Sequence, residues 1–118
     1  MDYNRIIGSI FVLSIFIMSS FGKIMDKIGT LNSINSKNIP FPQLAYLFAI
    51  FSQVIGIIII LLNVFEIYDN KNVLNIGKLS IIVFTTLATY YFHNIFTSDN
   101  QEISFFKNLG LIGGILLI

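Results

Sequence analysis

Long apolar stretches without charge constrain this chain more than any other feature of its sequence. Residues 6–22 and 44–65 contain no charged side chain, and neither does the stretch over about residues 79–96. A fourth stretch covers about residues 103–118, with Lys107 as its one charge. A helix that crosses a bilayer needs about 20 mostly apolar residues, within a range of roughly 17–25. The four stretches therefore predict four membrane helices, of which the fourth is marginal in length.

The two end stretches each leave an alternative open. The fourth either spans the bilayer, with Lys107 reaching toward the headgroups, or is a half-inserted helix that its neighbours hold in place. The first follows Arg5 and resembles a signal peptide in outline. Its apolar run exceeds the usual length of about 7–15 residues, which favours a retained helix.

The scarcity of charge explains why these stretches belong in lipid. Of the 118 residues, 11% are charged, whereas a soluble domain has roughly 25%. So few charges could not cover the surface of a small chain in water, so much of that surface faces the lipid bilayer. Only helices and closed barrels pair all backbone groups in lipid, and residues 57–62 lack the alternation of a barrel strand. We predict an all-α fold, a membrane four-helix bundle with short loops that forms a single domain of residues 1–118.

Composition also excludes several classes of function. The net charge of +1 offers no electrostatic footprint for nucleic acid, which we do not expect as a partner. The chain has no cysteine, so it cannot carry out thiol chemistry or ligate a metal through thiolate. No nucleophile–base pair, phosphate loop or metal-ligand cluster is recognisable. We therefore expect no catalytic residue, no metal site and no independent catalytic activity.

Polar connectors separate the four stretches, at residues 23–43, 66–78 and 97–102. Pro42 suits the first turn of the second helix, where its missing N–H costs nothing. Ser98 or Asp99 could cap the fourth helix. The cationic residues divide almost equally between the two sides, so the positive-inside rule gives no orientation.

Several short motifs occur in an order that resembles the DoxX family of small four-helix membrane proteins. Ser20-Phe21-Gly22-Lys23 closes the first helix, Ile39-Pro40 precedes the second, and His93 lies near the end of the third. The most specific piece is Lys107-Asn108-x-x-x-x-Gly113-Gly114, which is similar to a family signature in the last helix. Arg5 stands where the family often has an arginine entering the first helix. The resemblance covers essentially the whole chain.

The second helix departs from the family pattern. The family usually has a glutamate there, followed three residues later by glycine, whereas this chain has Gln53 and Gly56. Glutamine can still form hydrogen bonds, but it cannot titrate. Any family chemistry that needs this carboxylate to exchange a proton would be lost here.

The resemblance implies a range of functions. Some family members are subunits of membrane oxidoreductase complexes, including a thiosulfate:quinone oxidoreductase, and distant relatives act in membrane trafficking. We therefore expect an accessory subunit of a membrane oxidoreductase complex, with a soluble or membrane redox subunit as its partner and a quinone as the possible cofactor. The alternative is a non-enzymatic membrane adaptor or structural protein. A transporter or channel is the weakest hypothesis, because no ring of charge is evident.

Polar residues inside membrane segments are costly and are therefore candidates for function. Gln53 lies about ten residues into the second helix, and His93, Lys107 and Asn108 lie where the third and fourth helices face the same side. They predict a small polar pocket, in which His93 could donate to a quinone carbonyl and Lys107 could hold an anion.

Each of these residues also has a structural interpretation. His93 follows Tyr90, Tyr91 and Phe92 and would fit an interfacial aromatic belt, while Lys107 would fit a headgroup anchor. Gln53 and Asn108 could simply join helices. A helix-packing role is predicted for five glycines: Gly22, Gly56, Gly110, Gly113 and Gly114.

Overall fold

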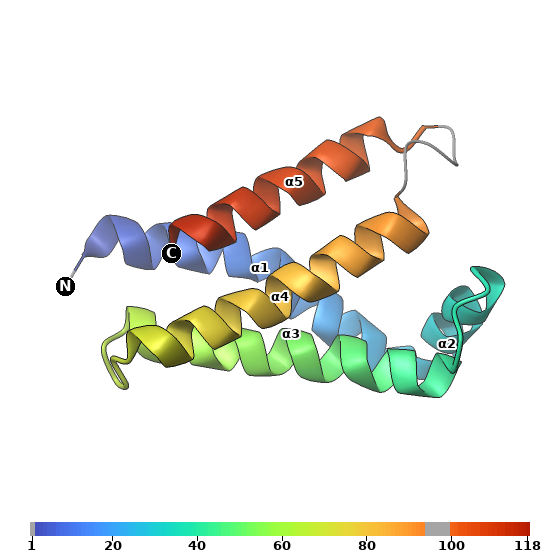
Figure 1. The fold of residues 1–118 in the computed structure, drawn as a ribbon, viewed down its shortest axis with the longest axis horizontal. Coiled ribbons are helices and arrows are strands. Elements are labelled where there is room, and N and C mark those ends of the chain that lie inside the picture. The colour runs from blue at the N-terminus through green and yellow to red at the C-terminus, as the bar shows by residue number, and fades with distance from the viewer. Residues whose placement is uncertain (1, 94–99) are drawn as a thin grey trace.

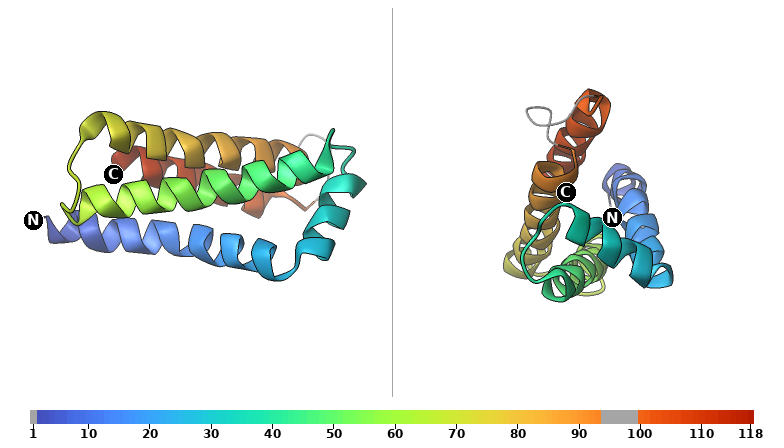
Figure 2. Two further views of the ribbon diagram at one scale, coloured as in Figure 1. Left: turned by 90° about the horizontal axis from the view of Figure 1, so that it is seen from below. Right: turned by 90° about the vertical axis from the view of Figure 1, so that its right-hand side faces the viewer.

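The structure, a computed structural model, describes residues 2–93 and 100–118. Its five helices are α1 (Tyr3–Met25), α2 (Lys27–Ser36), α3 (Pro42–Val64), α4 (Lys71–Phe92) and α5 (Glu102–Leu117). The four long helices run along the length of the molecule, and the short α2 lies across one end of it (Figures 1 and 2). The predicted all-α bundle is therefore confirmed.

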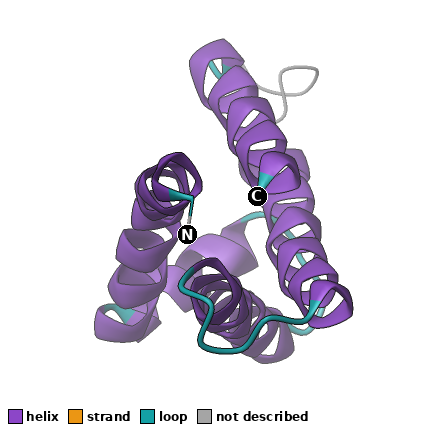
Figure 3. Cartoon of the chain, turned by 90° about the vertical axis from the view of Figure 1, so that its left-hand side faces the viewer, coloured by secondary structure: helices purple, strands orange, loops and turns teal. Residues whose placement is uncertain are grey.

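The helices pack around one apolar core. α3 contacts both α1 and α4, and α5 packs on α4 and α1. Figure 3 shows the bundle from the end at which the N- and C-termini lie. Nine buried apolar side chains from α1, α3, α4 and α5 form a continuous cluster that consists of Ile6, Leu13, Phe16, Ile57, Ile60, Val64, Leu74, Ile81 and Ile115. Because α5 contributes to this cluster, it belongs to the same packed unit as the other three long helices.

The outer faces of the bundle are apolar as well. Phe51, Ile58 and Leu79 are large apolar side chains with more than half of their surface exposed, at 58%, 52% and 59%. Such a surface suits hydrocarbon rather than water. Among the described residues, α1, α3 and α4 are long and apolar enough to cross a membrane. The chain is an integral membrane protein that crosses the bilayer more than once.

The fourth predicted span is shorter than the others. α5 has 16 residues, which corresponds to about 24 Å at 1.5 Å per residue, against about 30 Å of hydrocarbon. Its first turn begins at Gln101, whose side chain makes no capping hydrogen bond. The predicted caps Ser98 and Asp99 lie outside the described residues.

The connector at residues 23–43 was expected to be a loop, and the structure corrects this prediction. It contains the ten-residue helix α2. Asp26 ends α1 and caps α2, because its side chain accepts a hydrogen bond from the Gly29 N–H at 3.1 Å. α3 then begins at Pro42 in its first turn, as predicted.

The third predicted helix begins earlier than expected. α4 starts at Lys71 rather than near residue 79, so its first two turns lie in the stretch predicted to be a polar turn. Asn70 makes this possible, since its side chain accepts hydrogen bonds from the N–H groups of Asn72 and Val73 at 3.0 and 3.3 Å. The cap and the buried Leu74 outweigh the polar composition of the segment.

Close helix packing occurs at only some of the predicted glycines. A Cβ on Gly56 would lie 2.5 Å from Ile81 Cγ1, and one on Gly114 would lie 2.9 Å from Val12 Cγ2. A Cβ on Gly22, Gly110 or Gly113 would meet no atom of the described residues within 4 Å. For these three glycines the packing role stays a prediction. The partner of Gly56 is Gly77, which the sequence did not single out.

Cationic side chains hold the end of α5 in place. Arg5 Nε on α1 donates to the Ile118 carbonyl oxygen at 2.9 Å, and Lys78 Nζ on α4 donates to the Leu116 carbonyl oxygen at 2.9 Å. The last carbonyls of a helix lack intrahelical partners and carry partial negative charge. Arg5 and Lys78 thus satisfy carbonyl groups at the C-terminal end of α5, which lies far from the α2 end of the bundle (Figure 1).

Candidate functional site: a polar cavity at the α2 end

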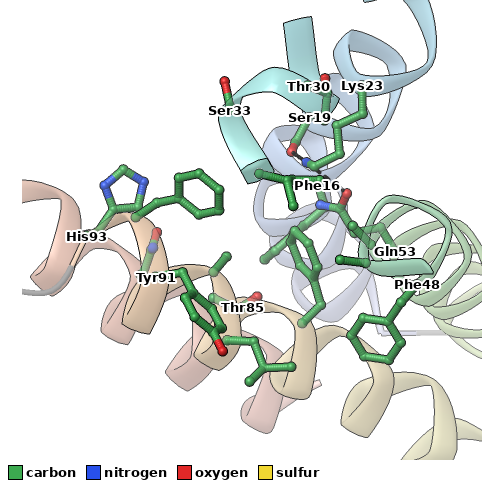
Figure 4. Close-up of a pocket in the computed structure, with 18 of the residues that line it drawn as sticks. Phe16, Ser19, Lys23, Thr30, Ser33, Phe48, Gln53, Thr85, Tyr91 and His93 are labelled. Atoms are coloured by element: carbon green, nitrogen blue, oxygen red, sulfur yellow. Dashed lines mark hydrogen bonds between the residues drawn. The ribbon is translucent and has the colours of Figure 1, made fainter. Parts of the chain in front are cut away.

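A cavity of about 590 Å³ lies between the helices at the α2 end of the bundle. All five helices contribute to its lining (Figure 4). The four residues predicted for a polar pocket, Gln53, His93, Lys107 and Asn108, all line this cavity. The structure thus brings together side chains from α3, the end of α4 and α5 that are far apart in the sequence.

The polar centre of the cavity is the contact between α1 and α3, in which Gln53 is buried while Lys23 and Ser19 are half-buried. Lys23 Nζ donates to Gln53 Oε1 at 3.2 Å and also to Ser19 Oγ, one turn earlier on α1. These three side chains gather on one side of the cavity in Figure 4. The Lys23 ammonium also lies 5.0 Å from the centre of the Phe84 ring, a cation–π contact with α4. Gln53 therefore joins two helices, as its structural interpretation proposed, and lines the cavity as well.

One polar atom of this centre lacks a partner. Gln53 has no exposed surface, and its Nε2 forms no hydrogen bond with any described residue. Lysine can only donate, so Gln53 must turn its oxygen toward Lys23 and leave its NH₂ group without an acceptor. A buried, unpaired donor costs about 1–3 kcal/mol, which an acceptor on a ligand or a water would recover.

Asn108 forms the second buried polar contact. Its Nδ2 donates to Thr89 Oγ1 at 2.9 Å, and Thr89 Oγ1 in turn donates to the Thr85 carbonyl oxygen at 2.7 Å. This contact joins α5 to α4 next to the cavity. Asn108 is 8% exposed, so the bond is protected from solvent. It fixes the face that α5 presents to the cavity.

His93 and Lys107 lie nearer the edge of the cavity. His93 is the C-cap of α4, and its Nδ1 is 2.9 Å from Gln101 Oε1, just before α5. It is half-buried and lies apart from the Lys23 cluster in Figure 4. Lys107 lines the cavity but is exposed. Both residues can therefore contact a ligand at the edge of the cavity.

Most of the remaining wall is apolar. Phe16, Phe48, Phe84, Tyr91 and Phe92 give it five aromatic rings. Among the residues that the structure describes, the lining includes two lysines and one histidine but no aspartate or glutamate. The described residues contain no group of three or more His, Cys, Asp or Glu side chains placed to hold a metal ion. The cavity thus suits an apolar ligand that carries hydrogen-bond acceptors.

Sequence reasoning missed two residues of the polar centre, Lys23 and Ser19. Lys23 was recognised as the end of the first helix but not as a site residue. The continuation of α1 to Met25 places Lys23 inside the helix, four residues after Ser19, so both side chains share one face. The signal available in the sequence was this i, i+4 spacing of a serine and a lysine at the end of an apolar run.

The fold and the cavity define a class: a multi-pass helical membrane protein with a polar cavity near one end of its bundle. The sequence model of the DoxX family matches residues 6–94. The chain therefore belongs to the DoxX family. Neither a curated protein nor a solved structure matches the sequence significantly.

Proposed function

We propose that this DoxX-family protein is an accessory subunit of a membrane oxidoreductase complex and holds a quinone in the cavity at its α2 end. The observation that carries the proposal is the convergence of Gln53, His93, Lys107 and Asn108 on one cavity, with Gln53 Nε2 left as an unpaired donor. The functional unit is the whole of residues 1–118, because α5 supplies Lys107 and Asn108.

The lining residues fit a quinone headgroup. Its two carbonyl oxygens are acceptors, and Gln53 Nε2 and the Lys23 ammonium are donors at the buried end of the cavity. The aromatic side chains along the wall offer faces to a flat ring. A bound quinone would supply the exchange of electrons, and the chain's own residues would position the ring and exclude water.

The partner protein would supply the remaining chemistry. This chain has no cysteine and one histidine, and no metal cluster lies among its described residues. We therefore assign substrate oxidation to a separate soluble or membrane subunit. Lys107 and His93, at the edge of the cavity, are the residues that would face such a subunit.

The test is purification of the full chain from its native membrane in a mild detergent. We expect a redox subunit to co-purify with it, together with extractable quinone. Gln53→Leu should reduce the bound quinone at least about fivefold, since it removes the unpaired donor at a cost of about 1 kcal/mol or more. Ser80→Ala, on the outer face of the α3–α4 contact, is the matched control and should leave the quinone content unchanged.

A second pair of variants separates this proposal from the alternative of a non-enzymatic adaptor. His93→Ala and Lys107→Ala should impair quinone-linked electron transfer by the complex while leaving membrane insertion normal. If both variants keep full electron transfer, or if the wild-type chain purifies alone without quinone, the adaptor function is favoured and the proposal fails.

A further inference from the structure

We infer that the buried end of the cavity binds an oxyanion, so that its ligand is an acidic amphiphile with one deprotonated oxygen on an apolar body. The inference rests on the proposed function only in that it concerns the same cavity. It adds that the ligand carries a negative charge on its headgroup. A cavity for a neutral quinone would not require this charge.

The first observation is a cation without a counter-ion among the described residues. Lys23 Nζ contacts the neutral Ser19 Oγ and Gln53 Oε1 and the ring of Phe84, and no lining residue in residues 2–93 and 100–118 is acidic. Taking an ammonium out of water is costly unless an opposite charge accompanies it. Two neutral acceptors and one ring face compensate for only part of this cost. An anionic oxygen beside Lys23 would supply the missing charge.

The second observation is independent of charge. Gln53 Nε2 is buried and has no acceptor among the described residues, while Gln53 Oε1 is already occupied by Lys23. Two groups at this end of the cavity can therefore still donate hydrogen bonds. They are the Nε2 amide group of Gln53 and the remaining ammonium proton of Lys23. A deprotonated oxygen can accept from both groups. An ammonium headgroup could accept a hydrogen bond from neither group, and the charge of Lys23 would repel it.

The third observation concerns the rest of the ligand. Phe16, Phe48 and Leu111 continue the lining with apolar surface, and α1, α3 and α4 place the cavity in a membrane-spanning bundle. A small hydrophilic anion would leave this surface uncovered, whereas an alkyl chain or a fused ring would cover it. Two sources share the required chemistry, namely a long-chain carboxylate and a quinone with an acidic ring hydroxyl.

The side chain at position 53 determines whether this end of the cavity can bind an anion. Gln53→Glu would place a carboxylate at the position of an amide that already contacts Lys23 at 3.2 Å. The new carboxylate would pair with the ammonium and repel an incoming oxyanion. Glutamine and glutamate have nearly the same size, and the substitution keeps the contact between α1 and α3. The variant should therefore fold while losing the anion site.

The experiment measures binding to the purified full chain in detergent by scintillation proximity with radiolabelled palmitate. Competitors come in matched pairs, palmitate against hexadecanol, and an alkylated 2-hydroxy-1,4-naphthoquinone against its methyl ether. Hexadecylamine serves as the cationic probe. We expect each acid to compete at least about tenfold more strongly than its neutral partner, because charge-assisted hydrogen bonds are the stronger kind. The amine should not compete.

The variants then locate the effect. Gln53→Glu and Lys23→Met should each abolish the preference, at least about tenfold, for an acid over its neutral partner, because binding of the acids falls further than binding of the neutral probes. Lys71→Met removes an exposed cation at the start of α4 and should change nothing. Equal binding of acid and neutral partner, undiminished binding of acid to Gln53→Glu, or no binding of any probe would overturn the inference.

The outcomes also separate this inference from the proposed function. If the two naphthoquinones bind equally well, the inference fails while the quinone proposal stands. If palmitate binds and neither quinone does, the inference stands with a lipid-derived carboxylate as the ligand, and the quinone proposal fails. Binding of the acidic quinone in preference to palmitate identifies the quinone as the source.

Discussion

Gly56 allows α3 and α4 to pack closely because it has a hydrogen atom in place of a side chain. A Cβ at this position would lie 2.5 Å from Ile81 Cγ1 and 2.9 Å from the Gly77 carbonyl oxygen. The carbonyl belongs to the backbone of α4 and cannot move without the helix. Gly56→Ala should therefore destabilise the bundle by about 1–3 kcal/mol, as overpacking usually does.

The matched control is Gly110→Ala, because a Cβ there would meet nothing within 4 Å. We expect this variant to change stability by no more than about 0.5 kcal/mol. Unfolding of both variants in mixed micelles of increasing SDS content provides the comparison. Equal midpoints for the two variants would contradict the packing that we describe between α3 and α4.

At the scale of single residues, the sequence predicted several residues that line the cavity but not Lys23 at its polar centre. Gln53 and Asn108 stood out because an amide inside an apolar helix is costly. Lys23 did not, since a lysine at the end of a predicted span is ordinarily a headgroup anchor. Whether the Lys23 side chain points into the bundle depends on where α1 ends and on the Ser19 and Gln53 oxygens, which accept its hydrogen bonds. Only the packed structure contains that information.

At the scale of the helix, α5 depends on its neighbours at its final turn. Arg5 and Lys78 donate to carbonyl oxygens of Ile118 and Leu116 at 2.9 Å each. A cation at this end of a helix stabilises it by about 0.3–1 kcal/mol. Arg5→Met and Lys78→Met together should therefore speed hydrogen exchange in α5 several-fold and leave exchange in α3 unchanged. Unaltered exchange in α5 would show that the two contacts do not hold this helix.

The lengths of the elements could be predicted only in part. The apolar stretches located all four long helices, since lipid favours paired backbone. They did not locate α2, which carries mostly polar residues and has one buried side chain, Ile34. They also missed the first turns of α4. In both cases an Asx side chain, Asp26 or Asn70, caps a helix that hydropathy alone does not indicate.

At the scale of the whole molecule, the order of the helices predicts the sides on which the connectors lie. The chain has no cysteine, so a single introduced cysteine reports its own position. A membrane-impermeant maleimide should label Lys37→Cys and Asp69→Cys from opposite sides of the bilayer, because α3 separates them. Asn100→Cys should behave like Lys37→Cys, because α4 leads back across. Labelling of all three from one side would contradict the membrane placement of the bundle.

The central proposal is that a ligand accepts a hydrogen bond from Gln53 Nε2, which has no partner among the described residues. The most direct measurement is the side-chain amide spectrum of the ¹⁵N-labelled full chain in lipid nanodiscs, recorded during titration with the alkylated hydroxynaphthoquinone. Asn63 is the internal control, since its buried amide donates to the Ile59 carbonyl oxygen and accepts from the Asn70 N–H, away from the cavity. We predict a saturable shift of the Gln53 amide signal with the Asn63 signal unmoved. A Gln53 signal that stays in place at saturating ligand would contradict the account.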